Sequence, residues 1–490
     1  MLRTAFLMAA VFLCCASASS FYTAAVFEHS PLESPPEKAV ARNLAIYKRA
    51  AAIAKSKHAD VIVFSEYGII PYFDRQEIRP FLENVPDPQK SDTTPCSERD
   101  TYSDRPILYT LSCIAQNHSM FVVANMGDIQ RCEGEPGCPS DGVFQYNTNV
   151  VFDRRGKLLV RYHKKNLFFE YSLDVPREEP SPVFETDFGT FATLVCFDLV
   201  YKRPSDFPKP IDGLMFTTEW LNLLPHFTSV QFFQSWAVGN NVTLLAANLQ
   251  KPWQANMGSG IFHGAEGALV YAFNPDKVSK LLVARVPKTG AAKVPPKASI
   301  TAFTEKDSWE HRDDGKDVPD ECSSKGPYSC TNEPMSRNYT FVRLREAAGR
   351  VEACHNGFCC SLSYSSNGLE EEQFHLGVFS GMYDLQNTYS WCEEECVLVR
   401  CDAAGGAACG KFPLRSNTRF HNVQMRANFT AGTTIYPSAV TSGMRLVQPH
   451  KWHLNRSRGA ITLSLADFAG MKLTSFGMKG RCYSKDPPGK

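Results

Sequence analysis

Residues 61–66 read Val-Ile-Val-Phe-Ser-Glu, four apolar residues followed by two polar ones. A short, wholly apolar run of this kind is typical of a strand buried on both faces of a sheet. Upstream, the apolar residues recur at three- and four-residue steps, as in an amphipathic helix: Val40, Leu44, Tyr47, Ala51 and Ala54. A strand is expected at 22–29, before that helix. Residues 22–66 therefore predict a β-α-β unit with Glu66 at the end of its second strand.

Apolar strands and helices continue to alternate as far as residue 287. A helix is expected near 107–116, and further strands at 120–125, 149–152, 158–162, 191–195, 213–217, 244–248, 268–273 and 281–286. This alternation predicts an α/β layer architecture, in which helices cover at least one face of a sheet. Lys164 and Cys196 follow two of these strands, as Glu66 follows the strand at 61–64. Sites of open α/β sheets gather at strand ends, so these three residues are candidates for one site.

The pattern changes after residue 287. Residues 288–335 are rich in Lys, Pro, Gly, Asp and Ser and show little periodicity, which predicts a linker pinned in part by Cys322 and Cys330. Residues 336–490 alternate short β-like stretches with Gly- and Cys-rich turns, which predicts a smaller, disulfide-stapled β domain. The expected order is a signal peptide at 1–20, an α/β domain at 21–287, the linker and the β domain, a division that suits a chain of 490 residues.

The ends and the charge of the chain indicate a secreted protein. Arg3 precedes an apolar run at 5–15 and small residues at 16–20, the pattern of a secretory signal peptide. A membrane anchor needs about 20 apolar residues, and the C-terminal stretch 465–490 has no apolar tail of the kind that GPI anchoring requires. A net charge of +1 without a long basic run argues against nucleic acid or an anionic membrane as partner.

The cysteine and glycosylation patterns agree with secretion into an oxidising extracellular compartment. The chain has 17 cysteines, of which Cys14 and Cys15 leave with the signal peptide. The remaining 15 are odd in number, so at least one thiol stays unpaired in an oxidising compartment. Without Cys196, an even number remains on each side of the linker: Cys96, Cys113, Cys132 and Cys138 before it, and ten cysteines from Cys322 to Cys482. Five sequons fit secretion: Asn117, Asn241, Asn338, Asn428 and Asn455, of which Asn241 leads into an apolar strand.

The three strand-end residues together suit amide hydrolysis. Taken singly, Cys196 reads as a small buried hydrophobe and the other two as solvated charges. A free thiol, with a pKa of about 8.5, is mostly protonated at neutral pH and needs a base or a cation nearby. Glu66 is suited to take the thiol proton, pass it to the leaving amine and later activate water. Lys164 is suited to stabilise the thiolate and the tetrahedral oxyanion, assisted by the backbone N–H of Phe197.

The short sequence segments around these residues resemble the three motifs of the nitrilase superfamily. They are Ile-Val-Phe-Ser-Glu at 62–66, Tyr-His-Lys-Lys-Asn-Leu-Phe at 162–168 and Val-Cys-Phe-Asp at 195–198. Ser65 and Tyr67 stand where relatives often have Pro and Asp, a departure beside the base rather than at it. Further stretches resemble the branch that contains biotinidase and the vanins: 144–152, 218–225, 258–261, 357–360, 376–379 and 441–444. The resemblance spans nearly the whole mature chain.

This resemblance implies an α-β-β-α nitrilase domain with a β-rich appendage, a triad of Glu66, Lys164 and Cys196, and no cofactor. It places Glu170 where many nitrilases have a second, supporting glutamate, although a surface carboxylate is the alternative. Trp220 and Asn222 are pocket residues by position, although a large aromatic is more often part of the core. Cys392 and Cys482 look like additions to the family's usual cysteines and are expected to pair.

The substrate implied is a small linear amide of a vitamin conjugate. A biotinidase-like enzyme would release biotin and lysine from biocytin, a pantetheinase would split pantetheine into pantothenate and cysteamine, and a non-enzymatic secreted binder would have lost the triad. Two cysteine groups also allow a metal reading: Cys354 and His355 with Cys359 and Cys360, or Cys392 with Cys396 and Cys401. A secreted, cysteine-rich domain favours disulfides over zinc ligands, so no metal is expected.

Overall fold

The computed structural model describes residues 19–33, 35–71, 74–178, 181–290, 295–304, 306–312, 318, 331–332, 338–402, 409, 412–457 and 459–487. The expected signal peptide lies outside the described residues except for its last two positions, and Cys322 and Cys330 lie outside them entirely.

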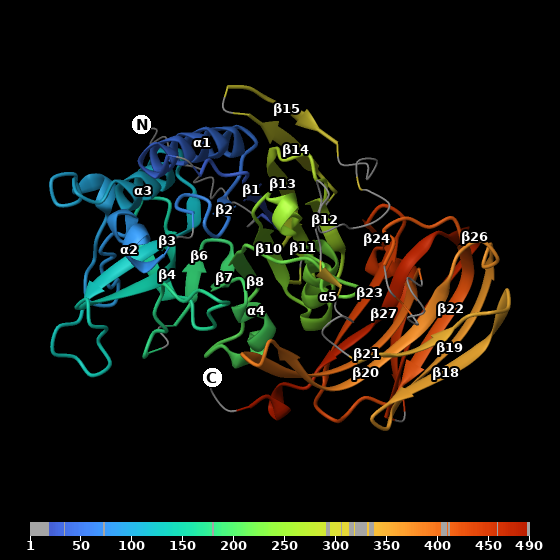
Figure 1. Ribbon diagram of the computed structural model, residues 1–490. Coiled ribbons are helices and arrows are strands. Elements are labelled where there is room, and N and C mark those ends of the chain that lie inside the picture. The colour runs from blue at the N-terminus through green and yellow to red at the C-terminus, as the bar shows by residue number, and fades with distance from the viewer. Residues whose placement is uncertain are drawn as a thin grey trace, which may run out of the picture.

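The first domain is built from two sheets (Figure 1). The eight-stranded sheet has the order β15 (Ser308–His311), β14 (Ala298–Phe303), β13 (Ser279–Pro287), β1 (Phe21–Glu28), β2 (Val61–Phe64), β3 (Phe121–Arg131), β4 (Val143–Phe152) and β5 (Leu158–His163). The six-stranded sheet has the order β12 (Gly267–Ala272), β11 (Ser259–His263), β10 (Thr243–Ala247), β8 (Gly213–Thr217), β7 (Gly189–Val195) and β6 (Val183–Thr186). Parallel pairing at the centre of each sheet, β1–β2–β3 and β7–β8–β10, is what the β-α-β pattern predicts.

Alternating side chains of the central strands divide the domain into layers. Ala25 and Phe27 of β1 join a core with α1 (Pro36–Ser56) and α3 (Pro106–His118). Ala24 and Val26 join a second core, with the six-stranded sheet. Successive side chains of a strand point to opposite faces, so α1 and α3 cover one face and the six-stranded sheet covers the other. Helix α5 (Ser229–Asn240) completes the expected α-β-β-α sandwich.

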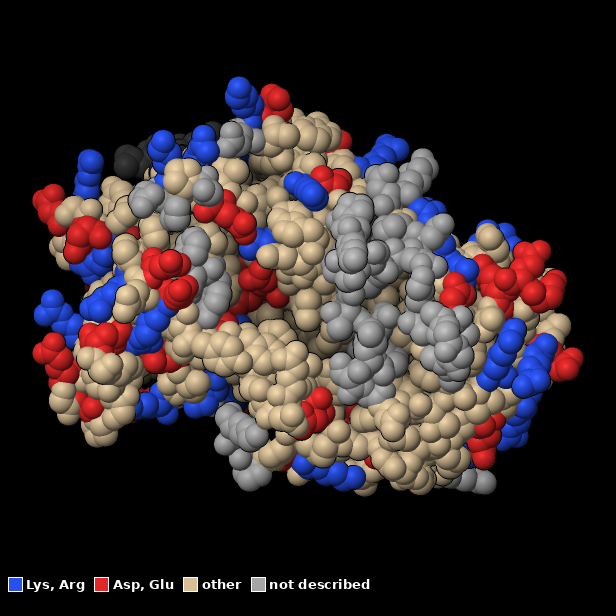
Figure 2. Space-filling view, in the orientation of Figure 1, with Lys and Arg blue, Asp and Glu red and all other residues tan. Residues whose placement is uncertain are grey.

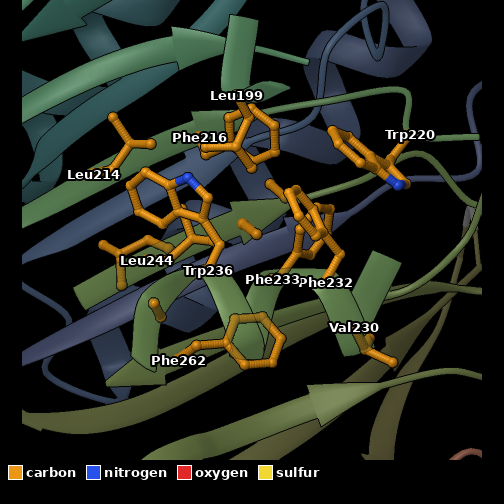
Figure 3. Close-up of a cluster of buried hydrophobic side chains, with 14 of the residues drawn as sticks. Leu199, Leu214, Phe216, Trp220, Val230, Phe232, Phe233, Trp236, Leu244 and Phe262 are labelled. Atoms are coloured by element: carbon orange, nitrogen blue, oxygen red, sulfur yellow. The ribbon is translucent and has the colours of Figure 1, made fainter. Parts of the chain in front are cut away.

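Helix α5 anchors the outer face of the six-stranded sheet through aromatic side chains (Figure 3). Phe233 packs edge-on against Phe216 of β8 and Phe262 of β11, and Trp236 is fully buried in the same cluster. Two one-turn helices complete the domain: α2 (Arg75–Ile78) and α4 (Asp198–Tyr201), which begins three residues after the end of β7.

The structure differs from the expected linker at 288–335. Residues 298–303 and 308–311 form β14 and β15, which extend the eight-stranded sheet beside β13. Ile300, Ala302 and Phe303 of β14 are buried, but this apolar segment is too short to stand out from its Lys- and Pro-rich surroundings. A further short pair joins β16 (Thr331–Asn332) to β9 (Leu223–Leu224).

The second domain consists of two antiparallel sheets. One has the order β17 (Thr340–Arg343), β20 (Phe374–Leu385), β21 (Tyr389–Arg400), β27 (Leu473–Arg481), β23 (Thr434–Thr441) and β24 (Arg445–Leu446). The other has the order β18 (Ala348–His355), β19 (Phe358–Asn367), β22 (Arg419–Ala427), β26 (Ala460–Met471) and β25 (Trp452–Ser457). Three strands, β20, β21 and β26, are 12 residues long. The sequence predicts shorter strands, because the turn-forming residues of this region suggest strand ends that lie closer together.

Every described disulfide pairs cysteines of the same domain. The bonds are Cys96–Cys113, Cys132–Cys138, Cys354–Cys359, Cys360–Cys396, Cys392–Cys482 and Cys401–Cys409. The expected Cys392–Cys482 pair is confirmed, and the cysteines of both metal readings are consumed in disulfides. Cys196 is the free cysteine of the described chain. Six disulfides are typical of a protein of an oxidising compartment.

The exposure of the sequons is consistent with glycosylation, and the described helices fall short of the requirements of a membrane span. All five sequon asparagines are exposed, including Asn241, which ends α5 in a left-handed conformation. Among the described helices, none combines the length and apolarity that crossing a bilayer requires.

The second domain is seated on α5 and on the turn after Cys196. Gln231 of α5 donates to the Ser438 hydroxyl at 3.1 Å, and Gln234 donates to the carbonyl of Val447 at 3.0 Å. The buried Arg481 guanidinium donates twice to the carbonyl of Val200 in α4, at 3.2 and 3.0 Å. These buried contacts hold the second domain against α5 and α4.

Candidate active site

Three strand ends of the first domain meet in one cavity. Glu66 follows β2, Lys164 follows β5 directly and Cys196 follows β7 directly, and all three line the same cavity. At Cys196 the backbone turns sharply with φ of 42°, and the N–H of Leu199 donates to its carbonyl at 3.0 Å. Tyr67 and Phe169, which also line the cavity, share this left-handed region with φ of 51° and 53°. Such strain in residues other than glycine clusters at functional sites.

A buried ion-pair cluster lies at the base of the cavity. The Lys164 Nζ is 2.8 Å from Glu66 Oε1 and 2.5 Å from Glu170 Oε2. The three side chains are 2%, 1% and 7% exposed, respectively. Burying three charges is costly unless they are paired and hydrogen-bonded, so this arrangement points to a role beyond stability. Glu170 is a member of this cluster and not the surface carboxylate of the alternative interpretation.

Neighbouring donors orient both carboxylates. The Asn147 amide donates to Glu66 Oε1 at 2.8 Å and to Glu170 Oε1 at 2.7 Å. The Tyr67 hydroxyl donates to the same Glu170 oxygen. The backbone N–H of Glu219 donates to Glu66 Oε2 at 2.7 Å. Both oxygens of Glu66 are therefore held in place by hydrogen bonds.

Asp198 ties the turn after Cys196 to the loop after Lys164. It is fully buried and accepts from the backbone N–H and the side-chain amide of Asn166, at 2.8 and 2.9 Å. It also accepts from the Tyr162 hydroxyl at 3.0 Å. These bonds hold Cys196 and Lys164 in a constant relative position.

Burial and charge set the protonation states of the cluster. Burial raises the pKa of Glu66 to about 7, with Lys164 lowering it and Glu170 raising it. Burial opposes the charge of Lys164, but the carboxylates of Glu170 and Glu66 outweigh it and hold the Lys164 pKa well above its ordinary value. Burial likewise opposes the charge of Glu170, yet Lys164 keeps its pKa below the ordinary value. Burial and the nearby Glu66 carboxylate raise the pKa of the Cys196 thiol well above its usual range. The resting site thus holds a neutral thiol, an ammonium and an ionised Glu170, with Glu66 titrating near neutrality.

The cavity has a volume of about 540 Å³ and a strongly charged lining. The space-filling view shows acidic side chains gathered in a hollow of the first domain (Figure 2). The lining residues are Glu33, Glu66, Tyr67, Pro71, Lys164, Phe168, Phe169, Glu170, Cys196, Glu219, Leu221, Lys251, Gln254 and Asn256. Within the described ranges, no group of three or more His, Cys, Asp or Glu side chains is arranged to hold a metal ion.

The second domain supplies aromatic side chains next to the site. The Tyr389 hydroxyl accepts from the backbone N–H of Phe169 at 2.6 Å, and its ring packs edge-on against Phe197 with centroids 5.0 Å apart. Trp391 packs edge-on against the same Phe197 ring at 5.7 Å. A small apolar cavity beside Cys196 is lined in part by Trp391 and Trp220. The β domain therefore forms part of the wall of the site.

Two site residues expected from the sequence have different surroundings. Trp220 lines the small apolar cavity, and its indole donates to the Phe227 carbonyl at 3.0 Å. Asn222 does not line either cavity, because its amide donates to the carbonyls of Ala255 and Met257 at 2.8 and 3.1 Å. It is a buried loop brace rather than a pocket residue.

Several residues of the site were not expected from the sequence. They are Tyr67, Asn147, Glu219, Lys251, Glu33 and Tyr389. Asn147 carries a usable sequence signal, because it stands with Gln145, Thr148 and Asn149 in one buried strand, and buried polar groups need hydrogen-bond partners.

Comparison with known proteins identifies relatives along the whole chain. The carbon-nitrogen hydrolase family model matches residues 23–205, and the vanin C-terminal domain model matches residues 328–486. A pantetheinase of Bos taurus is 32% identical over 98% of this chain and 93% of its own length. A biotinidase of Bos taurus is 34% identical over 88% of this chain and 87% of its own, and a biotinidase of Takifugu rubripes is 32% identical over 95% of each.

Proposed function

Because the chain belongs to the carbon-nitrogen hydrolase family that carries a vanin C-terminal domain, and is an amide hydrolase, we propose that it cleaves a linear amide of a vitamin conjugate through a thioester on Cys196. One observation carries the assignment of the site: a free, buried thiol shares a cavity with a lysine held between two buried carboxylates. Apart from Cys196, each cysteine of the described chain is in a disulfide.

In the proposed first half-reaction, Glu66 takes the proton of the Cys196 thiol while Sγ attacks the carbonyl carbon of the amide. The C=O π electrons move to the oxygen, and the Lys164 ammonium and the backbone N–H of Phe197 stabilise this oxyanion. Glu66 then gives its proton to the amide nitrogen, the C–N bond breaks, and the amine leaves. Cys196 keeps the acyl group as a thioester.

In the second half-reaction, water replaces the departed amine and Glu66 removes one of its protons. The resulting hydroxide attacks the thioester carbonyl, the same two donors hold the oxyanion, and the C–S bond breaks. The proton returns from Glu66 to sulfur, so that thiol and carboxylate are regenerated. Glu66 suits this exchange because a base works best when its pKa lies near the working pH, and burial raises the Glu66 pKa to about 7.

Glu170 is proposed to act indirectly, through its effect on Glu66 and Lys164. The Glu170→Gln variant should shift the acid limb of the pH profile of kcat/KM to lower pH. The negative charge of Glu170 raises the pKa of Glu66, and without it the Lys164 ammonium would favour the ionised form of Glu66 more strongly. A pH profile from 5 to 9 measures this shift. An unmoved limb together with a lower plateau would mean that Glu170 acts only by holding Lys164 in place.

The first candidate substrate is a biotinyl amide such as biocytin, which would yield biotin and lysine. The second candidate is pantetheine, because relatives named pantetheinase match this chain at nearly the same identity as those named biotinidase. Purified protein should be assayed on both amides side by side. Turnover of biocytin at ten or more times the kcat/KM of pantetheine is the expected result. The opposite ranking would assign the second substrate, and cleavage of neither would reject both.

We also propose that the protein is secreted and glycosylated. The described disulfides and the exposed sequon asparagines support this. A non-enzymatic binder is the alternative of another class. An intact, buried and hydrogen-bonded charge cluster beside a free thiol argues against it, since a structure selected only for binding has no need of such a cluster.

A further inference from the structure

The mouth of the cavity carries a second charged group, separate from the proposed catalytic cluster. The Lys251 Nζ is 2.7 Å from Glu33 Oε1 and 3.5 Å from Glu219 Oε1. The Lys251 side chain is 6% exposed, whereas those of Glu33 and Glu219 are 46% and 23% exposed. All three line the cavity that contains Cys196. None has a part in the proposed chemical steps.

The backbone connects this group to the proposed proton donor. The N–H of Glu219 bonds Glu66, and the Glu219 carboxylate lies beside Lys251. Lys251 is held in turn by paired backbone hydrogen bonds with Asn256, at 2.7 and 3.2 Å. Glu66 must touch the leaving nitrogen to protonate it, and Glu219 is the residue that joins Glu66 to Lys251.

The charges of the lining also favour a particular kind of leaving group. The cavity has four carboxyl groups, those of Glu33, Glu66, Glu170 and Glu219, against the two ammonium groups of Lys164 and Lys251. An ammonium on the ligand is therefore favoured, and an anion without one is disfavoured. Lys251 has three N–H donors on its ammonium, so a ligand carboxylate can bond it beside Glu33. The exposed part of the Glu33 carboxylate can accept from a ligand ammonium.

We propose that Glu33 and Lys251 form a leaving-group site that selects an amine bearing an α-amino-acid head, with its ammonium on Glu33 and its carboxylate on Lys251. This inference rests on the proposed function and deepens it. It assigns the recognition of a charged leaving amine to these two residues of the cavity lining.

Four biotinyl amides test this proposal, because they differ only in the leaving amine. They are biocytin, with both charges; biotinyl cadaverine, with the ammonium alone; biotinyl 6-aminohexanoate, with the carboxylate alone; and N-pentyl biotinamide, with neither. For the wild type, kcat/KM should be at least about tenfold higher for biocytin than for the pentyl amide, since bonds to charged groups discriminate on this scale. Equal efficiency on all four amides would overturn the proposal while leaving the proposed substrate class intact. Cleavage of none of them would instead reject the substrate class.

Two variants assign each charge to its residue. Lys251→Met should remove the advantage of biocytin over the cadaverine amide, and Glu33→Gln should remove its advantage over the aminohexanoate. Lys277→Met is the matched control, because Lys277 is exposed, lies over the Trp253 ring and does not line the cavity. It should leave both ratios unchanged. If Lys251→Met lowered kcat/KM of all four amides by one factor, its role would be structural and the proposal would be wrong.

Discussion

Replacing Cys196 with alanine is expected to lower amide turnover by about 10⁴-fold or more, because no thioester can form. Cys196 is buried and free of any disulfide, and alanine removes only the sulfur. The thermal unfolding midpoint should therefore change little in comparison with the loss of turnover. The measurement is kcat on whichever amide the wild type cleaves, with a thermal melt of both proteins.

Two further measurements test whether the thiol group itself, and not only the shape of the side chain at residue 196, is required. Cys196→Ser keeps a hydroxyl at the same place and is expected to lose nearly as much turnover, because a hydroxyl is far less acidic than a thiol and Glu66, with a pKa of about 7, is too weak a base to activate it. Iodoacetamide followed by peptide mapping should label residue 196 in the native wild type, and an amide substrate should slow that labelling. Near-normal turnover of Cys196→Ala would refute the covalent mechanism.

The sequence predicts the scaffold of the site well because the strands that carry it are largely apolar. The runs at 61–64 and 191–195 are buried strands, and Glu66 and Cys196 lie beyond their ends as expected. The helix stripe is also confirmed, with Leu44, Tyr47, Ala51 and Ala54 buried in α1. Local periodicity is sufficient here because each element buries a continuous apolar face.

The parts that the sequence does not predict depend on contacts between distant segments. Glu33 and Lys251 lie 218 positions apart in loops without periodicity, so only the folded chain reveals their ion pair. Tyr389 reaches the site because α5 and Arg481 seat the β domain against the first domain. Asn222 is the opposite case: its position in a motif suggested a pocket residue, but its side-chain amide bonds backbone carbonyls of a neighbouring loop.

Glu66→Gln is expected to lower kcat/KM by about 10²–10⁴-fold, the usual contribution of general acid-base catalysis, and to remove the acid limb of the pH profile. In the wild type, kcat/KM should rise as the pH increases through about 7, because Glu66 must be ionised to accept the thiol proton. Glutamine has a single carbonyl oxygen, so it can accept from Lys164 or from the Glu219 N–H but not from both, and it cannot take up a proton. Glu83→Gln is the matched control: Glu83 is also buried with a pKa of about 7, yet it bonds the N–H groups of Ile107 and Leu108 at the start of α3 and lies outside the cavity lining. The acid limb of the pH profile of Glu83→Gln should remain at the wild-type position. An acid limb that persists in Glu66→Gln would assign the proton transfer to another group.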